Sequence, residues 1–370
     1  MNVPFLDLKA QIPKIRKDIE ERFSRIIDNT AFVCGREVNE FEERFAELHD
    51  VKYCVGLSSG TDGNQLALLC CGIGEGGEVI VPVNTFIATA EGVSHCNAEP
   101  VFVDVDEKTF NIDNNKIEGN ITSRTKAINP VHLFGQPSDM DRIREVAKKY
   151  NILVIEDAAQ AHCAEYRGKR VGGIGRVASW SFYPGKNLGA WGEAGALTTN
   201  DEEVYRKALK LRDHGSEKKH YHDLVGFNYR MSEFQAAVLN VKMKYIEEWT
   251  EKRRLNAYRY NQGLDEIASI IRPSALDGVK HAYHLYVIRA KERDKLQAYL
   301  KESGIGAGVH YPFPLHLTGA YSYLGYKKGD FPVAEKLADE ILSLPMYAEL
   351  TEEQIDYVCE KINDFYNKKT

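Results

Sequence analysis

A lysine at position 186 stands in a segment whose residue types could support amine chemistry. Residues 179–189 read SWSFYPGKNLG, so Lys186 follows an apolar run typical of a buried strand and then a Pro-Gly turn. Ser181 places a hydroxyl group where that strand would end. An ammonium group held away from water can lose its proton, and the free amine can form an imine with a carbonyl compound. A lone lysine in a loop is usually solvated instead, and the segment alone leaves both interpretations open.

A carboxylate ends another apolar run, at Asp157 in residues 155–162 (IEDAAQAH). Open α/β sheets bind ligands beyond the carboxyl ends of their strands, where Asp157 would lie. The carboxylate could only cap a helix, or it could hold the cationic ring nitrogen of a pyridinium cofactor. Gln160 follows three residues later, and its amide group could reach the same ligand.

A third segment, residues 57–62 (LSSGTD), ends a strand and opens a helix. Free backbone N–H groups and the positive end of the helix would meet there, which is an arrangement that binds phosphate. Gly60 lets the backbone approach a ligand closely, and the hydroxyl groups of Ser59 and Thr61 can donate hydrogen bonds. On this segment alone, a well-capped helix start is the favoured interpretation.

The glycines Gly72, Gly74 and Gly77 match the pattern G-x-G-x-x-G. They follow a predicted helix and precede a predicted strand, which is the reverse of the order in a dinucleotide-binding fold. A nicotinamide site is therefore not expected. A P-loop is not expected either, because Lys186 is followed by Asn187.

The composition is that of an ordinary globular chain, with 43 % hydrophobic and 28 % charged residues and a net charge of −6. No large basic surface is expected, so neither nucleic acid nor a membrane is a predicted partner. The first twenty residues carry seven charges, and no apolar run approaches the roughly 20 residues needed to cross a bilayer. We expect a soluble, cytoplasmic protein.

Cysteine and histidine spacing argues against a metal centre. The seven cysteines form an odd set without C-x-x-C, which favours buried reduced thiols over a zinc site or disulfides. The close histidine pairs, His220/His222 and His281/His284, lack a matching cluster of carboxylates or thiolates. No metal is predicted.

Short apolar runs alternate with helical patterns through the first two thirds of the chain. This order predicts a mainly parallel α/β sheet covered on both faces. In residues 138–150, Ser138 is the candidate helix cap. The predicted strands are 53–57, 78–83, 100–105, 125–131, 152–156, 178–182 and 194–199.

The pattern changes near residue 232. Residues 232–264 are expected to form one long helix, followed by a strand at 284–289 and helices at 291–303 and 351–366. We predict an N-terminal arm (1–30), a large domain (31–245) and a smaller α+β domain (246–370). The arm is expected to pack on the small domain or on a partner subunit.

Taken together, the segments resemble the DegT-type sugar aminotransferases, a branch of the fold-type I enzymes that use pyridoxal 5′-phosphate (PLP). The resemblance covers nearly the whole chain, and its motifs are long. It implies a large domain with a seven-stranded, mostly parallel sheet between helices. It rests on residues 3–8 (VPFLDL), 58–61, 156–162, 181–186, 226–231 (GFNYRM), 331–335 (FPVAE) and 342–345 (LSLP). Gly63, Asn64 and Glu193 depart from the family pattern, away from the proposed chemistry.

The resemblance also implies roles for single residues. Lys186 would form the Schiff base with PLP, Asp157 would pair with the pyridine nitrogen, and Gln160 would contact the ring hydroxyl. Phe86 would stack on the ring, and Asn228 would reach the phosphate of the neighbouring subunit's cofactor, which implies a homodimer with shared sites. The residues expected to hold the phosphate are Gly60, Thr61 and Ser181.

The family mechanism implied by the resemblance is ping-pong transamination. L-Glutamate would convert PLP to pyridoxamine phosphate, a nucleotide-linked keto-sugar would then take the amine, and Lys186 would move the proton in each half-reaction. Some relatives carry histidine in place of the lysine and are dehydratases, so Lys186 favours transamination.

The opening VPFLDL and Tyr183, where 4-aminotransferases often carry histidine, resemble the branch that acts on dTDP-3-keto-6-deoxyhexoses and gives the 3-amino-3,6-dideoxyhexose. Tyr183, His310 and Tyr311 would then meet the hexose, although residues 309–312 could equally be a structural turn. Lys219 could reach the diphosphate from the partner chain, or be a solvated lysine. The alternatives are a 4-keto or UDP-acetamido-sugar aminotransferase and a non-catalytic regulator on the same fold.

Overall fold

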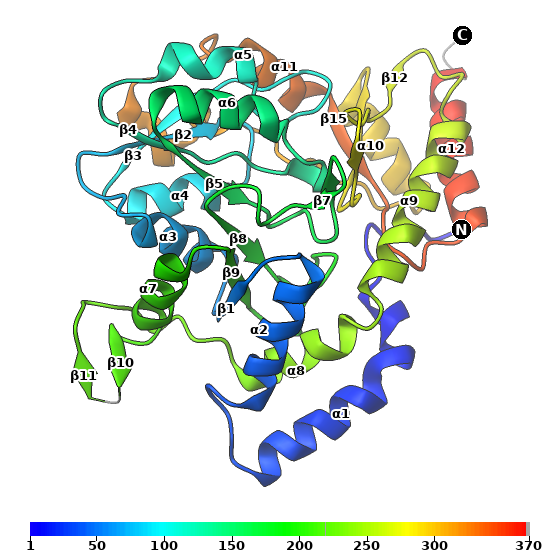
Figure 1. Cartoon of the computed structure of the whole chain (residues 1–370). Helices are drawn as coiled ribbons and strands as arrows, with labels where there is room; N and C mark the ends of the chain where they lie inside the picture. The colour runs from blue at the N-terminus through cyan, green and yellow to red at the C-terminus, as the bar shows by residue number, and fades with distance from the viewer. Residues whose placement is uncertain (219, 368–370) are drawn as a thin grey trace.

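A seven-stranded sheet forms the centre of the larger part of the molecule (Figure 1). The computed structural model describes residues 1–218 and 220–367. The strand order is β1-β9-β8-β5-β4-β2-β3, and all neighbours are parallel except β9, which runs antiparallel to β1 and β8. The strands are β1 (Tyr53–Leu57), β2 (Glu78–Pro82), β3 (Glu99–Val103), β4 (Thr125–Ile128), β5 (Leu153–Asp157), β8 (Val177–Ser181) and β9 (Gly195–Thr199). The predicted fold class and all seven predicted strands are confirmed.

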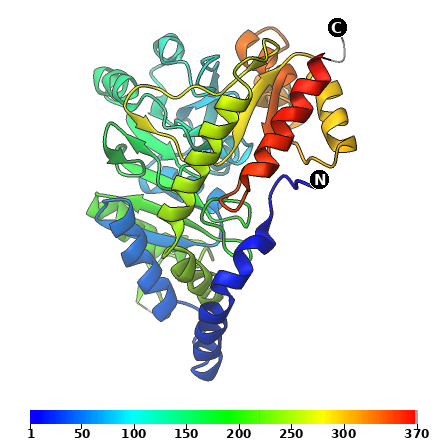
Figure 2. The same cartoon turned by 90° about the vertical axis from the view of Figure 1, so that its right-hand side faces the viewer.

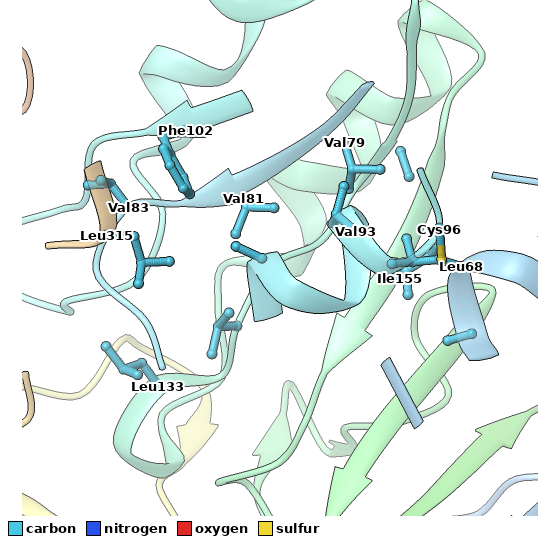
Figure 3. Packing of buried hydrophobic residues seen from close by; sticks show 14 of the residues in the cluster. Leu68, Val79, Val81, Val83, Val93, Cys96, Phe102, Leu133, Ile155 and Leu315 are labelled. Carbon is cyan, nitrogen blue, oxygen red and sulfur yellow. The ribbon is translucent and has the colours of Figure 1, made fainter. Parts of the chain in front are cut away.

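Apolar residues on both faces of this sheet explain why its strands lack a simple polar alternation. In β2, Val79 and Val81 belong to one buried cluster, whereas Ile80 points to the other. Figure 3 shows the first cluster, in which Val79 and Val81 lie with Leu68 of α3 and Val93 of α4. The sheet is therefore a buried middle layer, and only its strand ends remain for function.

Helices cover the two faces of the sheet. Helices that contribute to the clusters on its faces include α2 (Arg36–Leu48), α3 (Gly60–Cys70), α4 (Ala88–His95), α5 (Asn114–Ile117), α6 (Met140–Tyr150), α7 (Glu202–Arg212) and α8 (Glu233–Lys242). The residue that caps α6 is Asp139, not Ser138 as predicted. Ser138 is fully buried and donates its hydroxyl proton to the Val131 carbonyl oxygen at 2.8 Å.

The long helix predicted over 232–264 is wrong in one respect. A turn at residues 243–245 separates α8 from α9 (Ile246–Gly263), although the sequence there contains neither Pro nor Gly. The two helices bury different neighbours, because α8 packs against α1 (Ile12–Asp28) and α2, whereas α9 packs against α12 (Glu352–Asn367). Tertiary packing thus overrides a continuous helical pattern.

The C-terminal part contains a three-stranded antiparallel sheet of order β12-β14-β15, flanked by helices. Its elements are β12 (Ile270–Ile271), β14 (Tyr286–Ala290), α10 (Arg293–Glu302), α11 (Pro332–Glu340) and β15 (Ile341–Leu344). The short elements elsewhere are β6 (Glu165–Tyr166), β7 (Lys169–Arg170), β10 (Ser216–Lys218), β11 (Tyr221–His222), β13 (Val279–Lys280), η1 (Leu8–Gln11), η2 (Glu118–Asn120), η3 (Leu133–Gly135), η4 (Leu315–Leu317) and η5 (Gly319–Leu324). The strand and helices predicted after residue 284 are present, and the proposed domain boundaries remain a prediction.

The N-terminal segment runs from α1, which projects at one end of the molecule, back to the C-terminal part (Figure 2). Val3 forms a parallel bridge with Ile305, so the predicted contact of the arm with the C-terminal part is present. All seven cysteines are free, but Cys34 is exposed, so the expectation of buried thiols fails at that position. Across residues 1–218 and 220–367, no helix has the length and apolar character needed to cross a membrane.

Candidate active site

A cavity of about 800 Å³ opens where the carboxyl ends of β5 and β8 meet the N-terminus of α3. This is the edge at which open α/β sheets bind ligands. Segments from the whole chain contribute to its wall. The predicted residues that line it are Gly60, Thr61, Phe86, Asp157, Gln160, Ser181, Tyr183, Lys186, His310 and Tyr311.

Lys186 lies in the wall of this cavity at the end of a tight turn. Its backbone N–H donates to the Tyr183 carbonyl oxygen at 2.8 Å, which closes the Pro-Gly turn that the sequence predicted. Burial lowers the pKa of Lys186 to about 8, because the charged ammonium loses hydration, and the Asp157 carboxylate opposes this shift. A substantial fraction of the side chain is therefore a neutral amine near neutral pH, as nucleophilic and proton-transfer chemistry requires.

Asp157 ends β5 and is held by two donors. Its Oδ1 accepts from the Ala159 N–H at 3.1 Å, and its Oδ2 accepts from the Thr89 hydroxyl at 2.7 Å. Thr89 is buried, pairs with the Thr85 hydroxyl at 2.9 Å, and its carbonyl oxygen accepts from the Asn64 side chain at 2.8 Å. These two hydrogen bonds fix the orientation of the carboxylate. Sequence reasoning missed Thr89, although its position just after the exit of β2 was a usable signal.

The start of α3 combines the two interpretations given to residues 57–62. Ser59 is the cap, because its Oγ accepts from the Asp62 N–H at 3.1 Å. The first helical residues, Gly60 and Thr61, present the free N–H end of the helix to the cavity. A Cβ at Gly60 would lie 2.6 Å from the Cβ of Ser181, so only glycine fits between α3 and β8.

Gln160 is engaged by the protein on both sides of its amide. Its Oε1 accepts from the Phe134 N–H at 2.7 Å, and its Nε2 donates to the Tyr311 hydroxyl at 3.2 Å. A ligand in the predicted contact with Gln160 would therefore share the Gln160 amide with the Tyr311 hydroxyl. Phe86 lies beside Tyr311, with ring centroids 5.8 Å apart, and leaves half of its surface exposed toward the cavity.

The outer wall carries aromatic and histidine side chains. His310 Nδ1 lies 2.9 Å from the Ser343 hydroxyl, and the ring of Phe5 stacks on the His310 ring. His284 also lines the cavity, and burial holds its pKa well below the usual value, so this imidazole is neutral. Phe5 and His284 were not predicted as site residues. Residues 3–8 were used only as a family motif, and no local signal before β14 marks His284 as a cavity residue.

Two predicted residues are not part of this wall. Asn228 is exposed, pairs with Asp213 in an isolated bridge, and does not line the cavity of its own chain. Lys219 lies outside the described residues. Among residues 1–218 and 220–367, no three His, Cys, Asp or Glu side chains gather as a metal site.

The groups present in the cavity match the parts of PLP. The Lys186 amine suits its aldehyde, the fixed Asp157 carboxylate suits its pyridine nitrogen, and the start of α3 suits its phosphate. Asn64 and Glu193 line the same cavity, so the expectation that these departures from the family pattern lie away from the chemistry is wrong. Asn64 adds a buried Oδ1 without a hydrogen-bond partner among the described residues. The residues present therefore fit the cofactor.

Comparison with known proteins extends this match over the whole chain. The model of the DegT/DnrJ/EryC1/StrS aminotransferase family matches residues 13–363. A pleiotropic regulatory protein from Geobacillus stearothermophilus is 46 % identical, with 99 % of each chain covered. The dTDP-3-amino-3,6-dideoxy-alpha-D-galactopyranose transaminase of Aneurinibacillus thermoaerophilus is 44 % identical, over 98 % of this chain and 99 % of its own. The crystal structure of S. venezuelae DesV in complex with a ketimine intermediate has a TM-score of 0.96 and 40 % identity, over 98 % of both chains.

Proposed function

Because the chain belongs to the DegT/DnrJ/EryC1/StrS aminotransferase family and is a PLP-dependent sugar aminotransferase, we propose that it moves an amino group from L-glutamate to a nucleotide-linked keto-sugar. The proposed substrate is a dTDP-3-keto-6-deoxyhexose, and the product is the dTDP-3-amino-3,6-dideoxyhexose. The observation that carries this proposal is the pairing of the Lys186 amine with the fixed Asp157 carboxylate in one cavity. The name of the relative from Aneurinibacillus thermoaerophilus supports the choice of a 3-amino sugar.

PLP, when bound, supplies an electron sink that stabilises negative charge at the substrate carbon. In the proposed mechanism, Asp157 would hold a proton on the pyridine nitrogen, and the hydrogen bonds from Thr89 and the Ala159 N–H would keep the carboxylate in place for that role. The N–H groups at Gly60 and Thr61, with the Ser181 hydroxyl, would bind the phosphate.

Lys186 Nζ would serve as the base that takes a proton from the carbon bearing the donor amine, and as the acid that returns a proton to the sugar carbon. A lysine pKa of about 8 suits both tasks, because each protonation state is accessible near neutral pH. The partly buried setting of Lys186 also limits competition from water at its amine.

The substrate half of the proposal assigns the hexose to Tyr183, His310 and Tyr311, all of which line the cavity. Asn228 and Lys219 are proposed to act from the partner subunit of a homodimer. The exposure of Asn228, outside the cavity of its own chain, supports a role toward another chain.

The proposal is tested by supplying the PLP-loaded protein with L-glutamate and, side by side, with dTDP-linked 3-keto and 4-keto-6-deoxyhexoses. We expect glutamate to shift the absorption to that of the pyridoxamine form, and the 3-keto sugar to be aminated preferentially. Preferential use of the 4-keto sugar would overturn the regiochemistry.

UDP-linked acetamido sugars belong in the same assay, because other relatives are named for UDP-linked 3-dehydro and 3-oxo sugars. Preferential amination of a UDP-linked sugar would overturn the choice of nucleotide. The name of the Geobacillus relative favours the regulator as a further alternative. Absence of turnover with every keto-sugar and with glutamate would support that alternative instead.

A further inference from the structure

The first seven residues, here called the N-terminal strap, dock on the C-terminal part (Figure 2). Two of them, Phe5 and Leu6, line the cavity. The Val3 side chain is fully buried. The Val3 N–H donates to the Gly304 carbonyl oxygen at 2.9 Å, and the Val3 carbonyl oxygen accepts from the Gly306 N–H at 2.8 Å. The strap is thus held like an added parallel strand, by backbone bonds that lie away from the cavity.

Two glycines make this docking possible. A Cβ at Gly306 would lie 2.5 Å from the Phe5 nitrogen, and a Cβ at Gly304, which has φ +76°, would lie 2.8 Å from the Met1 carbonyl oxygen. Both contacts are with backbone atoms, which cannot move aside as a flexible side chain could. The position of the strap therefore depends on the absence of side chains at these sites.

The docked strap delivers Phe5 and Leu6 to the cavity. The Phe5 ring stacks on His310, with centroids 5.5 Å apart and planes at 18°. Leu6 packs on the buried cluster that contains Met346, and its Cδ2 would lie 3.6 Å from a Cβ at Gly185, next to Lys186. Together with Leu285 and Met346, which also line the cavity, the two residues give the outer wall an apolar corner.

We propose that this apolar corner is a subsite for the deoxygenated edge of the sugar, and that Phe5 and Leu6 determine specificity for a 6-deoxyhexose. The inference rests on the proposed function and names the part of the chain that selects the sugar. A methyl group gains from leaving water against Phe5 and Leu6, whereas a hydroxymethyl group loses hydrogen bonds to water there. Glutamate has no such group, so the strap contributes to the sugar half-reaction alone.

The first test measures binding without turnover. We compare dTDP-6-deoxyglucose with dTDP-glucose, which differ only in the 6-hydroxyl group, by calorimetry on the PLP-loaded protein. We expect the 6-deoxy compound to bind about tenfold more tightly, in line with what an apolar pocket can discriminate. Phe5→Ala should bring the two affinities to within about twofold of each other. Equal affinities in the unmodified protein would overturn the inference and leave the aminotransferase proposal standing.

The second test displaces the strap by a substitution at a residue that does not itself line the cavity. Gly306→Ala should displace the backbone at Phe5, whereas Gly319→Ala, at a glycine with open space around it, is the matched control. We expect Gly306→Ala to lower kcat/KM of the sugar half-reaction about tenfold, while the glutamate half-reaction, followed by cofactor absorption, stays within about twofold.

Gly319→Ala should leave both half-reactions unchanged. Equal losses in both half-reactions of Gly306→Ala and Phe5→Ala would show that the strap is only structural, and no loss in either would show that it does not meet the sugar. Absence of all turnover in the unmodified protein would instead contradict the proposed function, and the binding ratio would still report on the strap.

Discussion

Two halves of the cavity differ in how the chain builds them. The inner half comes from strand ends of the large sheet and the helix that follows β1, and contains Gly60, Asp157, Ser181 and Lys186. The outer half brings the strap and the C-terminal part beside the loop that follows β8, and contains Phe5, Tyr183, His310 and Tyr311. The inner groups are fixed by short hydrogen bonds and close glycine contacts, whereas the outer ones are aromatic rings with part of their surface open. The difference suggests that reaction chemistry and sugar selection are separable in this molecule.

Replacement of Lys186 by alanine should give the largest effect. Without the amine, neither proton transfer has its acid or base, so both half-reactions should slow by about 10³-fold or more. Single-turnover absorption measurements with glutamate and with the keto-sugar check this. Lys169→Ala, an exposed lysine on β7 away from the cavity, is the control and should retain activity. If Lys186→Ala lost only one half-reaction, the inner half of the cavity would not serve both half-reactions, and the proposed separation of chemistry from sugar selection would be wrong.

Removal of the Thr89 hydroxyl tests the inner half through a residue that contacts Asp157. Thr89→Val keeps the shape but removes the donor to Oδ2, and hydrogen bonds to charged groups are strong enough that about a tenfold loss is expected in both half-reactions. Thr89→Ser keeps the hydroxyl and should restore most of the rate. The absorption spectrum of the loaded protein, titrated with pH, should shift in Thr89→Val and not in Thr89→Ser. An unchanged spectrum in both variants would mean that Thr89 does not act through Asp157.

The pKa of Lys186 predicts how cofactor reloading depends on pH. In the cofactor-free protein, the reactive neutral amine should increase about tenfold between pH 7 and pH 9, with a midpoint near pH 8, where Lys186 titrates. The Asp157 carboxylate favours the charged lysine, so Asp157→Asn should move the midpoint to lower pH. Stopped-flow absorption after addition of PLP measures both midpoints. A midpoint near that of free lysine would contradict the buried setting of the amine.

Tyr183→Phe should give the smallest effect and should be confined to the outer half. Tyr183 is 55 % exposed, so loss of its hydroxyl removes a single hydrogen bond to the sugar at most. We expect KM for the nucleotide-linked sugar to rise about threefold and the glutamate half-reaction to be unaffected. Steady-state kinetics with each substrate varied in turn separate the two. An equal change for glutamate would place Tyr183 in the inner half.

The same division explains what could be predicted from the sequence. Strand ends and turn residues are local signals, so the seven strands and the convergence of Asp157, Lys186 and Gly60 on one cavity were accessible. The outer half depends on contacts between segments far apart in the chain, and neither Phe5 nor His284 carries a local mark.

Two of the structural errors, the single long helix and the cap at Ser138, have a related cause. The turn at 243–245 and the role of Ser138 depend on what each segment packs against, which local propensity does not reveal. Thr89 was partly predictable. Its hydrogen bond to Asp157 joins residues far apart in the sequence, but its position shortly after the end of β2 can be read from the local sequence.

The docking of the strap has a practical consequence for handling the enzyme. Met1 is 62 % exposed, but Val3 is sealed in the interior two residues later, so a purification tag fused ahead of Met1 would join the chain just before it enters the fold. Such a tag could displace the Val3 backbone and, with it, the Phe5 ring that stacks on His310 in the site. A tag on the C-terminal side of α12 would not be joined to the strap, and kinetic constants from the two kinds of fusion should not be pooled.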